Sequence, residues 1–195
     1  MKQVDFFLGL GSRYSYLAAT QVPAIARETG ARFVWRPLDS RALIARAGPD
    51  PFMATARRGQ YDPVYRTADA QRWARYYGVA YREPDWSSID WRLLALAGVA
   101  AGMLNVAERF AQAAYALCFE RACRTVSKDI LAMLAVEAGA SVSRFLALLQ
   151  SDAVQARHEE TIAAALSAGA FGVPSFVVDG ALFWGRIGCL CSAPI

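Results

Sequence analysis

Two serines with the spacing S-x-x-S stand where a strand-like segment gives way to a helix-like one. They are Ser12 and Ser15, within L-G-L-G-S-R-Y-S-Y-L-A at residues 8–18. A serine at the start of a helix can donate its hydroxyl proton to a thiolate, and the positive end of the helix dipole favours the anion. The motif has no histidine or lysine to deprotonate Ser12, and an unaided serine is a poor nucleophile. We therefore expect Ser12 to stabilise a negative charge and Ser15 to help start the helix.

The segments that flank these serines predict a β-α-β unit. Residues 3–8 have the pattern of a short buried strand. A helix is expected from Ser12 to about Thr29, because Gly30 follows as a C-terminal stop. Residues 31–36 read as a second strand, which a right-handed crossover would place parallel to the first.

A long helical pattern separates this unit from a hairpin near the other end of the chain. Residues 171–185, F-G-V-P-S-F-V-V-D-G-A-L-F-W-G, predict a strand, an Asp-Gly turn and an antiparallel strand. This order predicts an α/β fold in which residues 1–40 and 166–195 form a thioredoxin-like domain. Residues 41–165 are expected to form an all-helical insertion domain.

Composition and charge exclude several classes of partner. The chain has 195 residues, 55% of them hydrophobic, which is enough for a compact core. The net charge is +4, but Arg57-Arg58 is the only adjacent basic pair, so we expect no nucleic-acid partner. The apolar stretch from Leu93 to Val106 is too short to span a membrane, and no signal-peptide pattern precedes it. We therefore expect a soluble cytoplasmic protein that binds no membrane.

The cysteines and the single histidine do not have the spacing of a metal site, and no metal is expected. Cys118 and Cys123 lie five residues apart in a helical pattern. This spacing corresponds to about 140° around an α-helix, so the two thiols should face different ways. His158 stands beside two glutamates and is expected on the surface of a helix. The other two cysteines are Cys189 and Cys191.

Three motifs carry a resemblance to a known family. The stretch V-D-F-F-L-G-L-G-S-R-Y-S-Y-L-A (4–18) resembles the opening of the 2-hydroxychromene-2-carboxylate isomerases, which are grouped with kappa-class glutathione transferases and DsbA-like oxidoreductases. D-A-Q-R-W-A-R-Y-Y-G (69–78) and the hairpin segment 171–185 match further family motifs in the same order. The resemblance covers nearly the whole chain.

This resemblance implies a glutathione-dependent enzyme that isomerises a hydroxychromene carboxylate in naphthalene-type aromatic breakdown. Ser12 falls on the family's catalytic serine. Val173 and Pro174 fall on a valine and a cis-proline whose backbone binds the cysteinyl part of glutathione. The resemblance also implies glutathione contacts from residues of the final strand and its end, which are Trp184, Gly185 and Arg186.

The resemblance places the substrate contacts less specifically. The loop after the second strand and the segment near Pro84 correspond to the family's ligand wall, so Arg41, Arg46 and Trp86 are candidates for contacts with a carboxylate or a ring. Arg13 replaces a family proline and puts a cation next to the proposed thiolate, where it would lower the pKa of the thiol or bind an acidic group. Tyr14 and Tyr16 belong either to the core or to the pocket wall.

The segment 186–195 departs from the family pattern. The family continues with an Asp-Arg-Leu stretch that opens a closing helix, whereas this chain reads R-I-G-C-L-C-S-A-P-I, with Ile187 in place of the aspartate. With GC-rich codons, restoring one base after the Arg186 codon would give an Asp-Arg-Leu frame, so we hypothesise a frameshift. Without its closing helix the sheet would expose apolar surface, and we expect a homodimer.

Two alternatives to the isomerase remain open. A kappa-like glutathione transferase would use the same site to attack electrophilic substrates. A thioredoxin-fold binding protein without catalysis is the alternative from a different class. Thiol–disulfide exchange at the opening motif is not expected, because neither Ser12 nor Ser15 can form a disulfide. For the enzyme, the expected partner is a small aromatic carboxylate or an electrophile.

Overall fold

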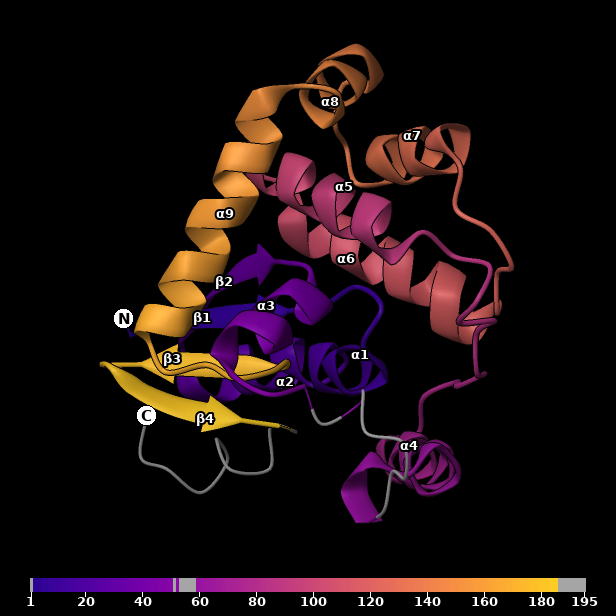
Figure 1. Cartoon of the computed structure of the whole chain (residues 1–195), viewed down its shortest axis with the longest axis vertical. Coiled ribbons are helices and arrows are strands. Elements are labelled where there is room, and N and C mark those ends of the chain that lie inside the picture. The colour runs from indigo at the N-terminus through magenta and orange to yellow at the C-terminus, as the bar shows by residue number, and fades with distance from the viewer. Residues whose placement is uncertain (1, 51, 53–58, 186–195) are drawn as a thin grey trace.

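The chain folds into a central sheet covered by helices (Figure 1). A computed structural model describes residues 2–50, 52 and 59–185. The elements of this part, in chain order, are β1 (Gln3–Leu8), α1 (Arg13–Ala19), α2 (Val22–Thr29), β2 (Arg32–Pro37), α3 (Ser40–Ala47), the 3₁₀ turn η1 (Gly59–Tyr61), α4 (Pro63–Tyr77), α5 (Trp91–Met103), α6 (Ala107–Tyr115), the π-helical turn η2 (Ala116–Glu120), α7 (Lys128–Glu137), α8 (Val142–Leu149), α9 (Asp152–Ser167), β3 (Ser175–Val178) and β4 (Ala181–Trp184).

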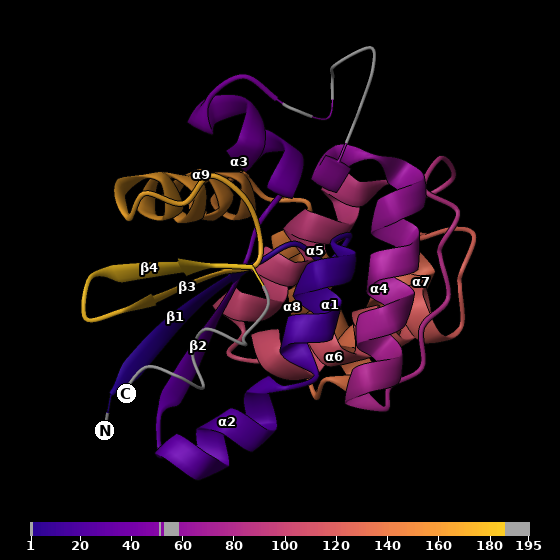
Figure 2. The same cartoon turned by 90° about the horizontal axis from the view of Figure 1, so that it is seen from below.

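The strands form a mixed sheet in the order β2-β1-β3-β4 (Figure 2). β1 pairs with β2 in parallel and with β3 in the antiparallel direction, so Phe6 stands opposite both Trp35 and Phe176. β3 and β4 are antiparallel and are joined by Asp179 and Gly180, both with positive φ. The predicted parallel pair and the predicted Asp-Gly hairpin are confirmed. All four strands of this sheet lie in the two segments predicted to form the thioredoxin-like domain.

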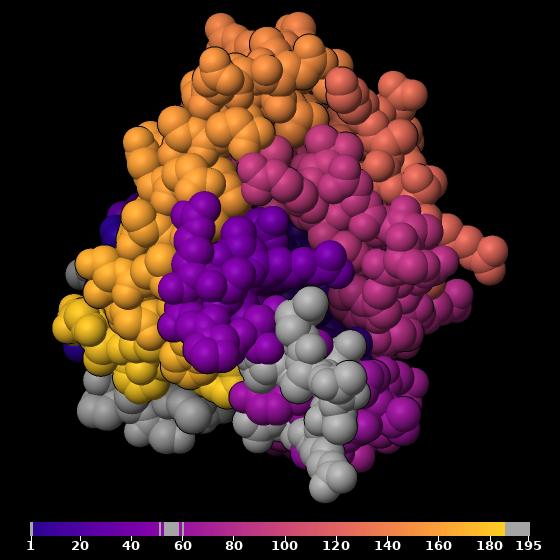
Figure 3. All heavy atoms as spheres, viewed as in Figure 1, coloured from indigo at the N-terminus to yellow at the C-terminus, as the bar shows by residue number. Residues whose placement is uncertain are grey.

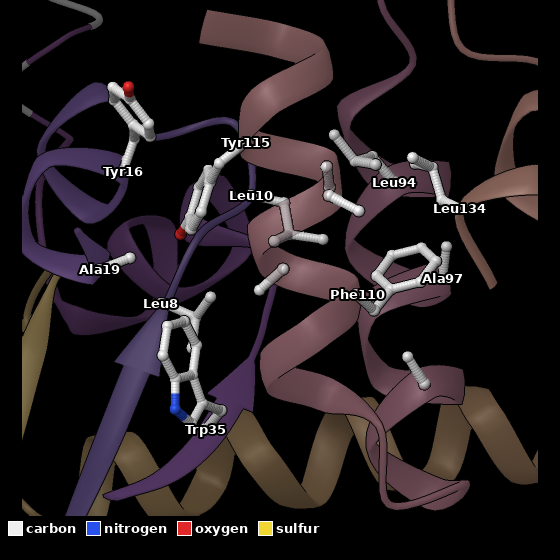
Figure 4. Close-up of a cluster of buried hydrophobic side chains, with 14 of the residues drawn as sticks. Leu8, Leu10, Tyr16, Ala19, Trp35, Leu94, Ala97, Phe110, Tyr115 and Leu134 are labelled. Carbon is white, nitrogen blue, oxygen red and sulfur yellow. The ribbon is translucent and has the colours of Figure 1, made fainter. Parts of the chain in front are cut away.

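The alternation of side chains along β1 divides the core between two faces of the sheet. Val4, Phe6 and Leu8 point to one face, where α1, α5 and α6 supply the covering side chains. Phe7 points to the other face and packs against Leu43 of α3 and side chains of α9. Figure 4 shows the larger cluster, with Leu8 and Trp35 from the sheet next to side chains of the helices.

Helix α5 approaches the end of the sheet closely at Gly98. A side-chain carbon placed there would lie 2.7 Å from Pro37 and 2.8 Å from Leu10. No larger residue fits without moving backbone or ring atoms, so this glycine sets the distance between α5 and the sheet. The close approach brings the start of α5, with Trp91, beside the loop that follows β1.

The predicted single helix from Ser12 to Thr29 is wrong in one respect, because it consists of two helices. α1 ends at Ala19, and α2 begins at Val22 with a proline in its first turn. Pro23 has no backbone N–H to donate, and its ring would clash with the carbonyl of a continuous preceding turn. The predicted stop is confirmed, since Gly30 caps α2 with φ of 69°.

The prediction that Cys118 and Cys123 face different ways is also wrong. The α-helical pattern of α6 gives way to the π-helical turn η2, where Arg121 N–H bonds to the carbonyl of Ala116 at 3.0 Å. A residue beyond that turn, Ala122, has φ of 52°. The wider turn and the reversal after it bring the two sulfurs to 4.0 Å from each other.

Helix α9 crosses the predicted boundary between the insertion and the thioredoxin-like domain at residues 165 and 166. The predictions for the segment 186–195, including the missing closing helix, Ile187 and the frameshift, concern residues outside the described part. None of the helices in the described ranges combines the length and hydropathy that a membrane crossing requires.

Candidate functional site

Ser12 is the N-cap of α1, directly after the turn that ends β1. Its Oγ accepts a hydrogen bond from the backbone N–H of Ser15 at 3.2 Å, which fixes the side chain at the start of the helix. Its own N–H donates to the carbonyl of Gly9 at 3.0 Å. Ser12 is partly exposed, and within the described residues its hydroxyl proton meets no acceptor. The hydroxyl is therefore both a helix cap and a donor available to a bound anion.

Ser15 has a different role, because it is fully buried. Its Oγ accepts a hydrogen bond from Gly9 N–H at 3.3 Å. Tyr115, from α6, donates its hydroxyl to the carbonyl of the same glycine at 3.2 Å. Burial raises the pKa of Tyr115 well above its usual value, so the phenol stays protonated and can donate. Ser15 thus holds the end of β1 against the start of α1 and is turned away from solvent.

The Val173–Pro174 bond is cis, as the family resemblance implied. Val173 lies next to the end of β1, since a side-chain carbon placed on Gly9 would be 3.2 Å from Val173 Cγ2. Ser12 and Val173 therefore both approach Gly9. In the described part of the chain, neither the N–H nor the carbonyl of Val173 makes a backbone hydrogen bond. These two groups form a short edge to which an extended peptide could add as a strand.

The end of β4 supports this edge. Gly185 N–H donates to the carbonyl of Pro174 at 2.9 Å. The half-exposed ring of Trp184 lies over Gly172, where a side-chain carbon would come within 3.1 Å of Trp184 Nε1. The structure thus brings the predicted residues Trp184 and Gly185 next to the cis-proline. Arg186, the third residue of that prediction, lies outside the described residues.

A small pocket of about 60 Å³ opens beside the loop after β1. Figure 3 shows a hollow on this side of the molecule, between α3 and the region of α5. Two predicted substrate contacts, Arg41 and Trp86, line the pocket, whereas Arg46 does not line it and pairs with Glu159 on the surface at 2.5 Å. The complete lining is Gly9, Leu10, Gly11, Leu38, Asp39, Ser40, Arg41, Trp86, Trp91 and Ala95.

Two indoles form one wall of this pocket. The rings of Trp86 and Trp91 are 5.1 Å apart, and Trp91 Nε1 donates to the carbonyl of Trp86 at 3.0 Å. Gly11 allows this arrangement, because a side-chain carbon there would lie 2.4 Å from the Trp91 ring. The two rings are inclined at 36° to each other and present apolar surface, which suits an aromatic ligand.

Arg13 is a buried cation behind Trp86, held by an ion pair. Its guanidinium contacts Glu83 Oε1 at 2.6 Å, donates to Thr67 Oγ1 at 3.1 Å and lies 5.0 Å from the centre of the Trp86 ring. Glu83 also accepts hydrogen bonds from Trp86 Nε1 at 2.6 Å and from the Tyr81 hydroxyl. The charge expected beside the thiolate is therefore paired with a carboxylate, and Arg13 orients Trp86.

A second arginine near Arg13, Arg66 of α4, was not predicted from the sequence. Its guanidinium lies 5.5 Å from the ring of Tyr14. Burial and the charge of Arg13 lower the pKa of Arg66. Tyr14 is half-buried and donates to Asp69 Oδ2 at 3.0 Å, and its pKa is raised by burial and by that carboxylate. Tyr14 thus lies between α1 and α4 and does not line the pocket.

Tyr16, the second tyrosine of the opening motif, belongs to the core and not to the pocket wall. It is buried, and its hydroxyl donates to the carbonyl of Ala80. Its ring stacks on Phe119 at 5.1 Å. Burial raises its pKa.

The predicted surface position of His158 is wrong, because its side chain is fully buried. Its Nε2 accepts a hydrogen bond from the N–H of Asp39 at 3.1 Å, at the N-cap of α3 and at the pocket wall. Burial and the nearby charge of Arg92 lower the pKa of His158, so the neutral ring is favoured. The signal was present in the sequence, since Val154 and Ile162, one turn away on either side, are both buried.

His158 does not belong to a metal site in this structure. Among residues 2–50, 52 and 59–185, no group of at least three His, Cys, Asp or Glu side chains is placed to hold an ion. The predicted absence of a metal site concerns the whole chain and stays a prediction.

A parallel β-α-β unit, an antiparallel hairpin, and a cis-proline directly before the third strand define the thioredoxin class of folds. A family model for the DsbA-like thioredoxin domain matches residues 3–188. A 2-hydroxychromene-2-carboxylate isomerase of Sphingobium xenophagum is 30% identical over 195 aligned positions, covering 95% of this chain and 93% of the relative. The chain therefore belongs to the DsbA-like thioredoxin family, among the 2-hydroxychromene-2-carboxylate isomerases.

Solved structures agree with this fold. The structure of a 2-hydroxychromene-2-carboxylate isomerase superposes with a TM-score of 0.79 at 22% identity, over 97% of this chain and 91% of the other. The cytosolic disulfide reductase DsbM from Pseudomonas aeruginosa, solved with GSH (glutathione), has a TM-score of 0.63 at 16% identity, over 98% of this chain and 93% of that one. At these identities the likeness establishes the fold.

Proposed function

We propose that this protein is a glutathione-dependent isomerase of 2-hydroxychromene-2-carboxylate or a close analogue, and that Ser12 stabilises the thiolate of bound glutathione. The observation that carries the proposal is the approach of both Ser12 and Val173 to Gly9. Ser12 supplies a hydroxyl donor, and Val173 supplies a backbone N–H and carbonyl that make no backbone hydrogen bond among the described residues. The curated relatives named as isomerases support the reaction class, and the GSH-bound disulfide reductase supports the choice of thiol.

The residues around Gly9 fit glutathione by their donor chemistry. A tripeptide can add to the N–H and carbonyl of Val173 as a short strand, which places its cysteine near the start of α1. The oxygen of the Ser12 hydroxyl already accepts a bond from Ser15 N–H, so its proton is available to a separate acceptor on the ligand. A hydrogen bond to a thiolate favours the anion and lowers the pKa of the thiol.

When bound, glutathione would supply a thiolate that adds reversibly to a conjugated double bond of the substrate and so permits rotation about it. The chain itself has three tasks. Ser12 holds the sulfur and its charge at the start of α1. The Trp86 and Trp91 wall binds the aromatic ring, and Arg41 at the pocket rim binds the carboxylate. The partly buried pair of Arg13 and Glu83 keeps Trp86 in place.

The test joins calorimetry with an isomerase assay on the same protein. We expect the wild-type chain to bind glutathione and to isomerise 2-hydroxychromene-2-carboxylate only in its presence. Ser12→Ala should lower kcat by about a hundredfold, as expected for loss of one preorganised donor to a developing or held charge. Ser143→Ala, on the exposed surface of α8, is the matched control and should leave binding and kcat unchanged.

Three results would contradict the proposal. Full isomerase activity in the absence of glutathione would show that glutathione is not the cofactor. Normal activity of Ser12→Ala would leave Ser12 as a helix cap only. Conjugation of glutathione to an electrophile such as a chlorodinitrobenzene, with no isomerisation, would favour a transferase.

A further inference from the structure

Two free thiols lie side by side where α6 ends. Cys118 Sγ and Cys123 Sγ are 4.0 Å apart and are not bonded to each other. Cys118 is fully buried, whereas Cys123 is partly exposed. A disulfide bond requires a sulfur–sulfur distance of about 2.05 Å, so closing it would need a shift of about 2 Å.

The backbone around the two thiols is irregular in a way that creates this proximity. In an α-helix, residues five positions apart point in directions that differ by about 140°. Here the π-helical turn η2 contains Cys118, and the N–H of Cys123 returns to the carbonyl of Leu117 at 3.1 Å. Ala122, just before the second thiol, has a left-handed backbone with φ of 52°, which an alanine adopts only with strain.

The two thiols differ in acidity as well as in exposure. The hydrogen bond between the two thiols lowers the pKa of Cys123, and the backbone N–H of Thr125 acts in the same direction. The hydrogen bond with Cys123 and burial raise the pKa of Cys118. The more acidic thiol is thus the one that solvent reaches, and the thiolate is the species that attacks a disulfide.

We propose that Cys118 and Cys123 form a reversible disulfide by exchange with a low-molecular-weight disulfide such as glutathione disulfide. The Cys123 thiolate attacks one sulfur of the oxidant, breaks its disulfide bond and releases one glutathione thiolate. Cys118 then loses its proton and attacks the Cys123 sulfur, which releases the second glutathione. The two protein thiols are oxidised, and one glutathione disulfide is reduced to two molecules of glutathione. This inference is independent of the proposed isomerase activity.

The pair adjoins the aromatic wall of the candidate site. Phe119, between the two cysteines in the sequence, stacks on Tyr81 with ring centres 5.9 Å apart and lies 6.1 Å from Trp86. A bond between the sulfurs would restrain the turn that carries Phe119. Oxidation of this pair is therefore a modification next to the pocket, carried by residues that do not line it.

The experiment exploits Arg121, which lies between the two cysteines. A variant with Cys189→Ser and Cys191→Ser serves as the parent, so that only the pair can react. The parent is equilibrated in glutathione buffers of increasing oxidised fraction, alkylated and digested with trypsin. Because trypsin cleaves after Arg121, a disulfide would keep peptides 110–121 and 122–124 joined until a reductant is added.

The expected product is the joined peptide pair, with the loss of two hydrogens from the intact protein. In the Cys118→Ala background Cys123 should instead retain one glutathione, because no second thiol can displace it. In the Cys123→Ser background, modification of Cys118 should be slower by about tenfold or more, since that sulfur is buried. The inference is overturned if both thiols stay free in the most oxidising buffer. It is also overturned if the parent stops at a mixed disulfide.

Discussion

The buried imidazole of His158 accepts a hydrogen bond from the backbone N–H of Asp39, 3.1 Å away. This bond joins α9 to the N-cap of α3, and the first turn of α3 borders the candidate pocket. The other ring nitrogen, Nδ1, is buried without a hydrogen-bond partner in the described part of the chain, and Glu159 Oε1 lies 3.6 Å from it. The hydrogen bond from Asp39 N–H to Nε2 makes His158 a positioning residue for the pocket wall.

His158 should make stability depend on pH in the acidic range. Burial and Arg92 lower its folded-state pKa, against the opposing carboxylates of Glu159 and Asp39. Between the folded pKa and the unfolded value of about 6.5, the unfolded chain binds more protons, so the free energy of unfolding rises with pH. The contribution is complete above about pH 6.5 and is lost as the pH falls toward the folded pKa.

Urea unfolding of wild type and His158→Gln over about pH 5 to 8 measures this effect. The glutamine can accept a hydrogen bond but does not titrate, so the stability of wild type relative to the variant should fall as the pH falls below about 6.5. His158→Ala should lose about 2 kcal/mol at pH 7.5, from the unpaired Asp39 amide and the cavity. A stability difference between wild type and His158→Gln that does not change with pH would contradict the lowered pKa of His158.

Glu83 should be more important for stability than an exposed glutamate. Its carboxylate accepts bonds from Arg13, Trp86 and Tyr81. Removal of the carboxylate's charge leaves Arg13 without this counter-charge. Glu83→Gln should lower the free energy of unfolding by about 2–3 kcal/mol. Glu160→Gln, which breaks the exposed pair with Arg157, is the control and should change it by less than about 0.5 kcal/mol. Equal losses of stability in Glu83→Gln and Glu160→Gln would be inconsistent with a partly buried Arg13–Glu83 pair.

The two glycines of α5 provide a matched test of the close approach to the sheet. Gly98→Ala would bring a methyl group to 2.7 Å from Pro37, and should destabilise the protein by about 1–3 kcal/mol. Gly102→Ala meets its nearest neighbour at 3.9 Å and should stabilise the helix by about 0.5–1 kcal/mol. Thermal and urea unfolding measure both, and opposite signs are the expected result.

Arg41 and Arg46 should differ in their effect on substrate binding. Arg41 lines the pocket, whereas Arg46 pairs with Glu159 outside its lining. If the substrate carboxylate binds at the pocket rim, Arg41→Gln should raise KM about tenfold with little change in kcat, and Arg46→Gln should leave both unchanged. Steady-state kinetics with 2-hydroxychromene-2-carboxylate decides this. An increase in KM for Arg46→Gln alone would move the carboxylate site away from the pocket.

Much of the fold was predictable because local patterns agree with it. The buried first strand, the Gly30 stop and the Asp-Gly hairpin each have strong local signals, and the structure confirms them. The break between α1 and α2 had a signal in Pro23, which outweighs the helical periodicity around it. The missing N–H of Pro23 therefore decides against one continuous helix.

The side chains of the site were less predictable, because tertiary contacts determine them. The approach of Cys118 and Cys123 depends on a π-helical turn that helical periodicity does not anticipate. Arg66 meets Arg13 only when α4 packs against α1. His158 is the exception, because its position one helical turn from the buried residues Val154 and Ile162 indicated burial. The two neighbouring glutamates favoured a surface position instead.

Gly9 receives bonds from two parts of the chain that lie far apart in the sequence. Ser12 and Tyr115 both donate to its carbonyl, Ser12 from the start of α1 and Tyr115 from the end of α6. Local opening of either part must break a bond at the same peptide group. Slow amide hydrogen exchange at the end of β1 and in α6 is therefore expected to have one common opening free energy. The sheet and α6 would then unfold as a single cooperative unit.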